Sequence, residues 1–178
     1  EAKIAAVQKK KVQREQLRKE LFALFAEPNA QKRGKALEGI LNRLFESEGF
    51  RIREAFTLCG TNGEGIVEQI DGVVEMDGHV YLVEMKWWKD PLGVGDVSQH
   101  IVRIYGRGNV RGIFISASGY TEPAITTCKD VLHTKVIVLC MLEELVQALD
   151  AELPLKTLRK DKVNAAIADK NPLHRRAS

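Results

Sequence analysis

The chain has 178 residues, of which 44% are hydrophobic and 29% are charged, and its net charge of +3 is too small to indicate nucleic-acid binding by itself. No apolar run approaches the length of a membrane span, and the charged residues 1–11 are unlike a signal peptide. The three separated cysteines fit neither a zinc site nor a disulfide framework, so we expect a cytoplasmic protein with no membrane partner.

The first part of the chain is predicted to be helical. Residues 5–25 form one helix, whose polar first half is a solvated arm, part of a coiled coil or a dimerisation helix. Pro28 ends it, because the residue before a proline disfavours helical geometry. A second helix is expected over residues 30–48, with Gly49 as its left-handed cap. The apolar stripe of this second helix consists of Leu37, Ile40, Leu41, Leu44 and Phe45.

A strand over residues 50–58 and a glycine-rich loop over residues 59–65 come next. A β-hairpin is then expected over residues 66–88, because Asp77-Gly78 between two apolar strands is the strongest short hairpin signal.

The register of this hairpin brings charged groups together. With its two turn residues in place, Asp71 lies directly opposite Glu84, and Gln69 lies opposite Lys86. Glu84 and Lys86 share one face because side chains alternate along a strand. The sequence therefore predicts two carboxylates and a lysine on one side of an otherwise apolar strand pair.

The rest of the chain alternates between helices and strands, which predicts parallel pairing of the last two strands in a mixed α/β sheet with helices on both faces. The expected elements are a helix at 94–105, a strand at 110–116, a helix opened by Pro123, a strand at 135–139, a helix at 141–149 and a short helix at 163–168. The expected divisions are a helical extension or linker at 1–28, the main domain at 29–150 and a basic tail at 151–178.

Two carboxylates and a lysine suit a metal-dependent phosphodiesterase. Asp71 and Glu84 supply the oxygen ligands that Mg²⁺ prefers, and the backbone carbonyl of Met85 adds another. The bound ion makes hydroxide available near neutral pH and neutralises charge on the phosphate. Lys86 orients the attacking water or stabilises the developing negative charge.

Glu38, at the edge of the apolar helical stripe, is the third candidate acid, ahead of Glu46 and Glu48 at the end of the helix. The structural alternative for Glu38 is an ordinary surface acid. The alternative for the central trio is an edge strand protected by charge. Apolar residues on both sides favour a buried central strand instead, where unpaired charges are costly. The four histidines lack metal-ligand spacing and are interpreted as structural.

Three segments resemble the Mrr-like branch of the restriction-endonuclease-like PD-(D/E)xK nucleases, over about residues 31–123. The segments are Arg33-Gly34-Lys35-Ala36-Leu37-Glu38, Gln69-Ile70-Asp71-Gly72 and Glu84-Met85-Lys86-Trp87-Trp88. The resemblance implies an αβββαβ core and hydrolysis of DNA that depends on Mg²⁺, with Mn²⁺ as a substitute. It also implies that Asp71 and Glu84 bind the metal, that Lys86 is the catalytic lysine and that Glu38 is the helix glutamate. Ile70 departs from the proline that often precedes the aspartate.

The resulting hypothesis is a DNA endonuclease domain of a prokaryotic restriction, defence or repair protein, acting as a homodimer or with a sensing or ATPase module. Candidate DNA contacts are Lys35, Lys89, Gln99, Arg103 and Arg107. Two alternatives stay open: a catalytically silent nucleic-acid-binding or assembly module on the same fold, and a structure-selective nuclease acting on junctions or RNA.

Overall fold

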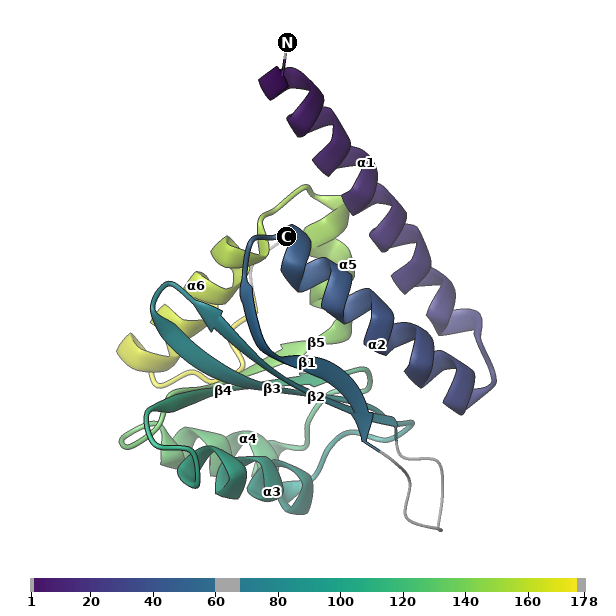
Figure 1. The fold of residues 1–178 in the computed structure, drawn as a ribbon. Helices are drawn as coiled ribbons and strands as arrows, with labels where there is room; N and C mark the ends of the chain where they lie inside the picture. The colour runs from purple at the N-terminus through teal and green to yellow at the C-terminus, as the bar shows by residue number, and fades with distance from the viewer. Residues whose placement is uncertain (1, 60–67, 176–178) are drawn as a thin grey trace.

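A five-stranded mixed sheet forms the centre of the computed structural model, which describes residues 2–59 and 68–175 (Figure 1). The strand order is β1-β2-β3-β4-β5, with β1, β2 and β3 antiparallel and β4 and β5 parallel to β3. The strands are β1 (Arg51–Cys59), β2 (Glu68–Met76), β3 (His79–Trp87), β4 (Val110–Ser116) and β5 (Ile137–Met141). The predicted mixed sheet and its parallel half are confirmed. Most of the predicted glycine-rich loop lies outside the described residues.

Helices cover both faces of this sheet (Figure 1). Side chains of α1, α2, α5 and α6 pack on one face, and those of α3 and α4 pack on the other. The helices are α1 (Ala2–Ala23), the 3₁₀ turn η1 (Leu24–Ala26), α2 (Ala30–Ser47), α3 (Val94–Tyr105), α4 (Glu122–Val131), α5 (Leu142–Asp150) and α6 (Leu155–Ala168). No helix among the described residues combines the length and apolar character needed to cross a bilayer.

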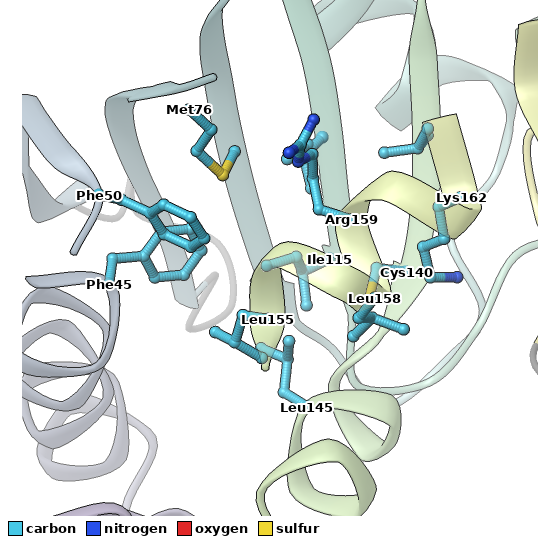
Figure 2. Close-up of a pocket in the computed structure, with 12 residues that line it drawn as sticks. Phe45, Phe50, Met76, Ile115, Cys140, Leu145, Leu155, Leu158, Arg159 and Lys162 are labelled. Carbon is cyan, nitrogen blue, oxygen red and sulfur yellow. The ribbon is translucent and has the colours of Figure 1, made fainter. Parts of the chain in front are cut away.

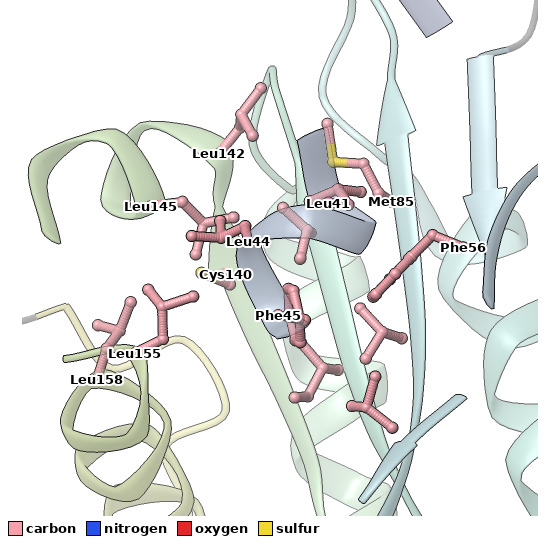
Figure 3. Packing of buried hydrophobic residues seen from close by; sticks show 14 of the residues in the cluster. Leu41, Leu44, Phe45, Phe56, Met85, Cys140, Leu142, Leu145, Leu155 and Leu158 are labelled. Carbon is pink, nitrogen blue, oxygen red and sulfur yellow. The ribbon is translucent and has the colours of Figure 1, made fainter. Parts of the chain in front are cut away.

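The larger core lies between α2 and the sheet. Figure 3 shows Leu41, Leu44 and Phe45 of α2 packed among side chains of the sheet, α5 and α6. The predicted apolar stripe of this helix is therefore confirmed as its buried face. The last helix differs from the prediction: it begins at Leu155 rather than near residue 163, because Leu155 and Leu158 also belong to this core.

The two halves of α1 have different surroundings. Leu17 and Leu21 in the second half are buried, whereas Ile4 and Val7 in the first half are 75% and 70% exposed. The first half projects beyond the body of the protein in Figure 1, which agrees with its polar sequence. This exposed first half is compatible with all three predicted roles: a solvated arm, part of a coiled coil or a dimerisation helix.

A buried ion pair joins α1 to α2. Arg14 binds the carboxylate of Glu48 and also donates a 2.8 Å hydrogen bond to the Leu153 carbonyl. The same carboxylate accepts a 3.0 Å hydrogen bond from the Leu155 amide at the start of α6. Glu48 therefore has a structural role between helices.

The β2–β3 hairpin has the predicted register. Asp77 and Gly78 both have positive φ, 50° and 75°, as a two-residue type I′ turn requires. The pairing then places Asp71 opposite Glu84 and aligns Gln69 with Lys86. Because β3 is also paired with β4, it is a central strand, and the alternative of a charge-protected edge strand is wrong.

Strand β1 is an edge of the sheet, and α2 supplies polar partners for its backbone. The Asn42 side chain accepts a 2.8 Å hydrogen bond from the Phe56 amide and donates one of 2.9 Å to the Phe56 carbonyl. The Glu38 carboxylate accepts a 2.8 Å hydrogen bond from the Leu58 amide. These contacts occupy backbone groups that would otherwise be open to another strand.

Two glycines test this packing. A Cβ on Gly72 would lie 2.6 Å from the buried ring of Phe56, whereas a Cβ on Gly39, exposed on α2, would meet nothing within 4 Å. We expect Gly72→Ala to lower the free energy of unfolding by about 1–3 kcal/mol through overpacking. Gly39→Ala should raise it by about 0.5–1 kcal/mol through helix propensity. Urea denaturation measures both values, and similar effects of the two substitutions would contradict the prediction.

The pKa of Glu38 predicts a pH-dependent contribution to stability. Burial raises this pKa, but the Lys35 ammonium and the Leu58 amide bind the ionised form and bring the pKa below its ordinary value of 4.5. The ionised carboxylate therefore stabilises the fold above pH 4.5, and this contribution is lost as the pH falls through the lowered pKa. We expect Glu38→Gln to be less stable than wild type near neutral pH, by a margin that shrinks below pH 4.5. Denaturation curves across this range measure the margin, and one that stayed constant would refute the assignment.

Candidate functional site

Asp71 and Glu84 converge on a single guanidinium. Arg103 of α3 places Nη2 2.7 Å from Oδ2 of Asp71 and Nη1 2.6 Å from Oε2 of Glu84. The two carboxylates come from neighbouring antiparallel strands and face α3 across one side of the sheet. They therefore share one cation in this structure, as their direct opposition requires.

Glu84 is almost completely buried, with 1% of its surface exposed. Its Oε2 atom lies 3.1 Å from Nδ1 of His100, whose side chain is also buried. Burial raises the pKa of Glu84, but the hydrogen bond with His100 and the charges of Lys86 and Arg103 outweigh it and hold the pKa below its ordinary value. This environment keeps Glu84 ionised inside the protein.

Lys86 is likewise buried, with 2% of its surface exposed. Its Nζ atom lies 3.6 Å from Oε1 of Glu84, 3.4 Å from Oδ1 of Asp96 and 4.7 Å from the ring centroid of Trp88. Asp96 is held in place because its other oxygen accepts a 2.9 Å hydrogen bond from the Gly93 amide at the start of α3. The ammonium is therefore positioned by two carboxylates and an aromatic face.

One face of α3 supplies three of these partners. Asp96, His100 and Arg103 are separated by four and three residues, the spacing that aligns side chains along a helix. The sequence interpretation missed Asp96, treated His100 only as structural and assigned Arg103 to DNA contacts. Their helical spacing, in a predicted crossover helix that follows the Glu-x-Lys strand, is the signal that could have identified them.

The structure does not bring Glu38 into contact with the other candidate acids. Its helix packs on the opposite face of the sheet, and its carboxylate binds the Lys35 ammonium at 2.6 Å and the Leu58 amide. The Met85 side chain is buried on that same face. A metal-binding role for Glu38, or for the backbone carbonyl of Met85, stays a prediction.

The predicted DNA-binding residues lie in several places. Arg103 and Arg107 line an open groove of about 410 Å³ together with Asp71. Arg107 is paired there with Glu54 at 2.9 Å. Lys89 and Gln99 are exposed, and Lys35 is exposed but bound to Glu38. Of the predicted contacts, Arg103 and Arg107 are therefore the two that line the groove beside the carboxylates.

A separate cavity of about 40 Å³ lies on the α2 face of the sheet. Figure 2 shows that its walls are mainly apolar, with nitrogen atoms from Arg159 and Lys162. The Lys162 ammonium is already bound by the Glu144 carboxylate at 2.8 Å and by the Leu139 carbonyl at 3.0 Å. This small space has no convergent reactive groups, so we place the candidate chemistry in the groove at Asp71.

The carboxylate oxygens of Asp71, which lines the groove, and of Glu84 behind it fit a hard divalent cation. The oxygens of Asp71 and Glu84 are close enough for one cation, the Arg103 guanidinium, to contact both. Within residues 2–59 and 68–175, no cluster of three or more His, Cys, Asp or Glu side chains is arranged to hold a metal. Two carboxylates are sufficient for Mg²⁺, because this ion keeps several of its waters when it binds protein.

Similar structures include restriction endonucleases. MspJI, solved with a 27-mer oligonucleotide, is 14% identical with a TM-score of 0.47, and the match covers 88% of this chain and 37% of that one. The modification-dependent endonuclease AspBHI is 18% identical with a TM-score of 0.40, covering 88% and 40%. A protein of unknown function, AF1548, is 18% identical with a TM-score of 0.41, covering 80% and 96%.

The chain thus spans less than half the length of the two endonucleases. No curated protein sequence matches it. A family model does: the Mrr_cat model, described as restriction endonuclease, matches residues 30–149, which contain the sheet, the hairpin acids and α3. The chain belongs to the Mrr_cat family of restriction endonucleases.

Proposed function

We propose that this chain is a Mg²⁺-dependent endonuclease domain that hydrolyses DNA phosphodiester bonds. The observation that carries the proposal is the convergence of Asp71 and Glu84 beside a buried Lys86 on the central strand pair. Membership of a restriction endonuclease family supports DNA as the substrate. Buried charges are costly unless they have a partner or a function. Metal binding by Asp71 and Glu84 would give these buried charged groups a function.

In this mechanism, Asp71, Glu84 and the backbone carbonyl of Met85 would hold the ion. When bound, the ion supplies a water of lowered pKa and neutralises charge on the phosphate. Lys86 directs its ammonium at the attacking water or at the oxygen that develops negative charge. Asp96 of α3 positions Lys86, because the Asp96 carboxylate lies 3.4 Å from Nζ of Lys86.

In our proposal the DNA substrate binds in the groove lined by Asp71, Arg103 and Arg107. Arg107 at the groove, together with exposed Lys89 and Gln99, contacts backbone phosphates in our proposal. Lys35, which is bound to Glu38, is a further phosphate contact in our proposal. Such folds usually use two copies to cut both strands, so in our proposal the domain acts as a homodimer or with a sensing or ATPase module of a restriction, defence or repair system.

A cleavage assay tests this function. We expect Asp71→Asn and Lys86→Met to reduce Mg²⁺-dependent nicking of duplex DNA by about 100-fold or more, because each removes a group that acts on transition-state charge. Glu75→Gln is the matched control, since Glu75 lies on β2 on the same face as Asp71 but pairs with Arg53. It should cleave like wild type.

The same assay separates the alternatives. Wild type that binds DNA but does not cut it with Mg²⁺ or Mn²⁺ would refute the enzyme and support a silent binding module. Preferential cutting of junctions or RNA over duplex DNA would support a structure-selective nuclease. Cleavage by Asp71→Asn at the wild-type rate would show that the chemistry lies elsewhere.

Glu38 has a smaller effect in our proposal. Glu38 binds the Leu58 amide of β1. The neighbouring residue Thr57 is paired with Asp71 of β2, so Glu38 lies at the edge of the candidate site. We expect Glu38→Gln to lower cleavage by about tenfold, less than Asp71→Asn, because Lys35 already neutralises this carboxylate. Rates are compared at a temperature where both variants are folded. A loss equal to that of Asp71→Asn would make Glu38 a direct metal ligand, and no loss would leave it structural.

A further inference from the structure

The Arg103 guanidinium stands where the proposed function requires a metal ion. Its two terminal nitrogens contact Asp71 and Glu84 at 2.7 and 2.6 Å, distances typical of strong charge-assisted hydrogen bonds. A divalent ion that used these oxygens would have to replace both contacts. The guanidinium and the ion are therefore alternative partners of the same carboxylates.

The charges around this position explain why a cation is needed there at all times. Among the side chains described at this position, Asp71, Glu84 and Asp96 provide three carboxylates and Lys86 provides one ammonium, so without Arg103 these four groups carry a net charge of −2 when His100 is counted as neutral. That excess equals the charge of one divalent ion. Arg103 removes half of it, and it does so next to a buried Glu84 that cannot be left unpaired without a large penalty.

Exposure indicates which partner can move. The Arg103 side chain is 41% exposed at the groove, whereas that of Glu84 is 1% exposed and is also bound by His100. The guanidinium can therefore leave towards the groove while Glu84 stays in place. Arginine at the end of a helix has the length and rotamer freedom for such a movement.

We propose that Arg103 is an internal counter-cation that holds the two carboxylates together and competes with the divalent ion for them. This inference rests on the proposed function, because it assumes that Asp71 and Glu84 bind metal. The inference adds that Arg103 raises the concentration of divalent ion needed to fill the site. The ion has to break the Arg103 contacts with both carboxylates before it binds, and this costs free energy. Arg103 is thus a positioning residue of the metal site, in addition to its predicted contact with DNA.

Arg107 provides a matched control. It lies four residues after Arg103, in the turn that follows α3, lines the same groove and has nearly the same side-chain exposure, 42%. Arg107 is paired with Glu54, whose side chain is 60% exposed. In contrast, Arg103 is paired with Asp71 and Glu84. Removing Arg107 changes the charge of the groove equally, so it separates general electrostatics from direct competition.

The experiment is titration of the protein with MnCl₂ by calorimetry, using wild type, Arg103→Met, Arg103→Lys and Arg107→Met. We expect Mn²⁺ to bind Arg103→Met about tenfold or more tightly than wild type, because the competing bidentate contact is gone. Arg103→Lys should lie between them, since an ammonium cannot form the same fork. Arg107→Met should stay within about twofold of wild type.

Thermal unfolding gives a second readout that does not depend on cleavage. In EDTA, Arg103→Met should unfold at a lower temperature than Arg107→Met, because two facing carboxylates lose their shared cation. Added Mn²⁺ should then raise its midpoint more than it raises that of wild type. If Arg103→Met does not fold, the Mn²⁺ titration and the thermal unfolding are both carried out with Arg103→Lys, with the same direction of change expected.

Failure of this inference differs from failure of the proposed function. Equal Mn²⁺ affinity in wild type and both Arg103 variants, abolished by Asp71→Asn, would overturn the competition and leave the metal site intact. Weaker binding in Arg103→Met would also overturn it. No Mn²⁺ binding by any of the proteins, or binding that Asp71→Asn does not reduce, would overturn the proposed metal site and this inference with it.

Discussion

A carboxylate in the middle of a β-sheet has to be neutralised by nearby groups, and Glu84 imposes this constraint on the whole molecule. Strand β3 is covered by helices on both faces and paired on both edges, so its charged side chains are almost completely buried in this structure. The surrounding elements meet the requirement: β3 itself supplies Lys86, and α3 supplies His100 and Arg103. The position of α3 over the sheet is thus inseparable from the electrostatics of the site.

The two faces of the sheet differ in composition: one is apolar, and the other carries the charged groups of the candidate site. On the α2 face, continuous apolar packing and the buried Arg14–Glu48 pair hold four helices against the strands. On the α3 face, apolar packing is interrupted at one end by charged groups that open into a groove. Because the apolar face supplies most of the buried hydrophobic contacts, the other face can retain closely spaced acids that are unfavourable for folding.

Family membership and geometry support the same function from independent directions. The family model identifies a restriction endonuclease domain, and the structure gathers two opposed carboxylates and a lysine beside a groove that Asp71 lines. In our proposal Arg103 links the state without metal to the state with it. Each state then satisfies the same two acids with a different cation, so neither leaves a buried charge without a partner.

The sequence by itself determined the mixed sheet, the bounds of α3 and β4, and the opposition of Asp71 and Glu84. These features depend on local signals: hydrophobic periodicity defines the elements, and the Asp77-Gly78 turn fixes the register of adjacent strands. Only the tertiary structure decided that Arg103 bridges acids as far as 32 residues away, that Asp96 and His100 join the site, and that Glu38 lies on the other face. It also decided that α6 extends the core. Such contacts depend on how a helix is rotated and placed on a sheet, and this follows from packing of the whole chain, not from any local pattern of residues.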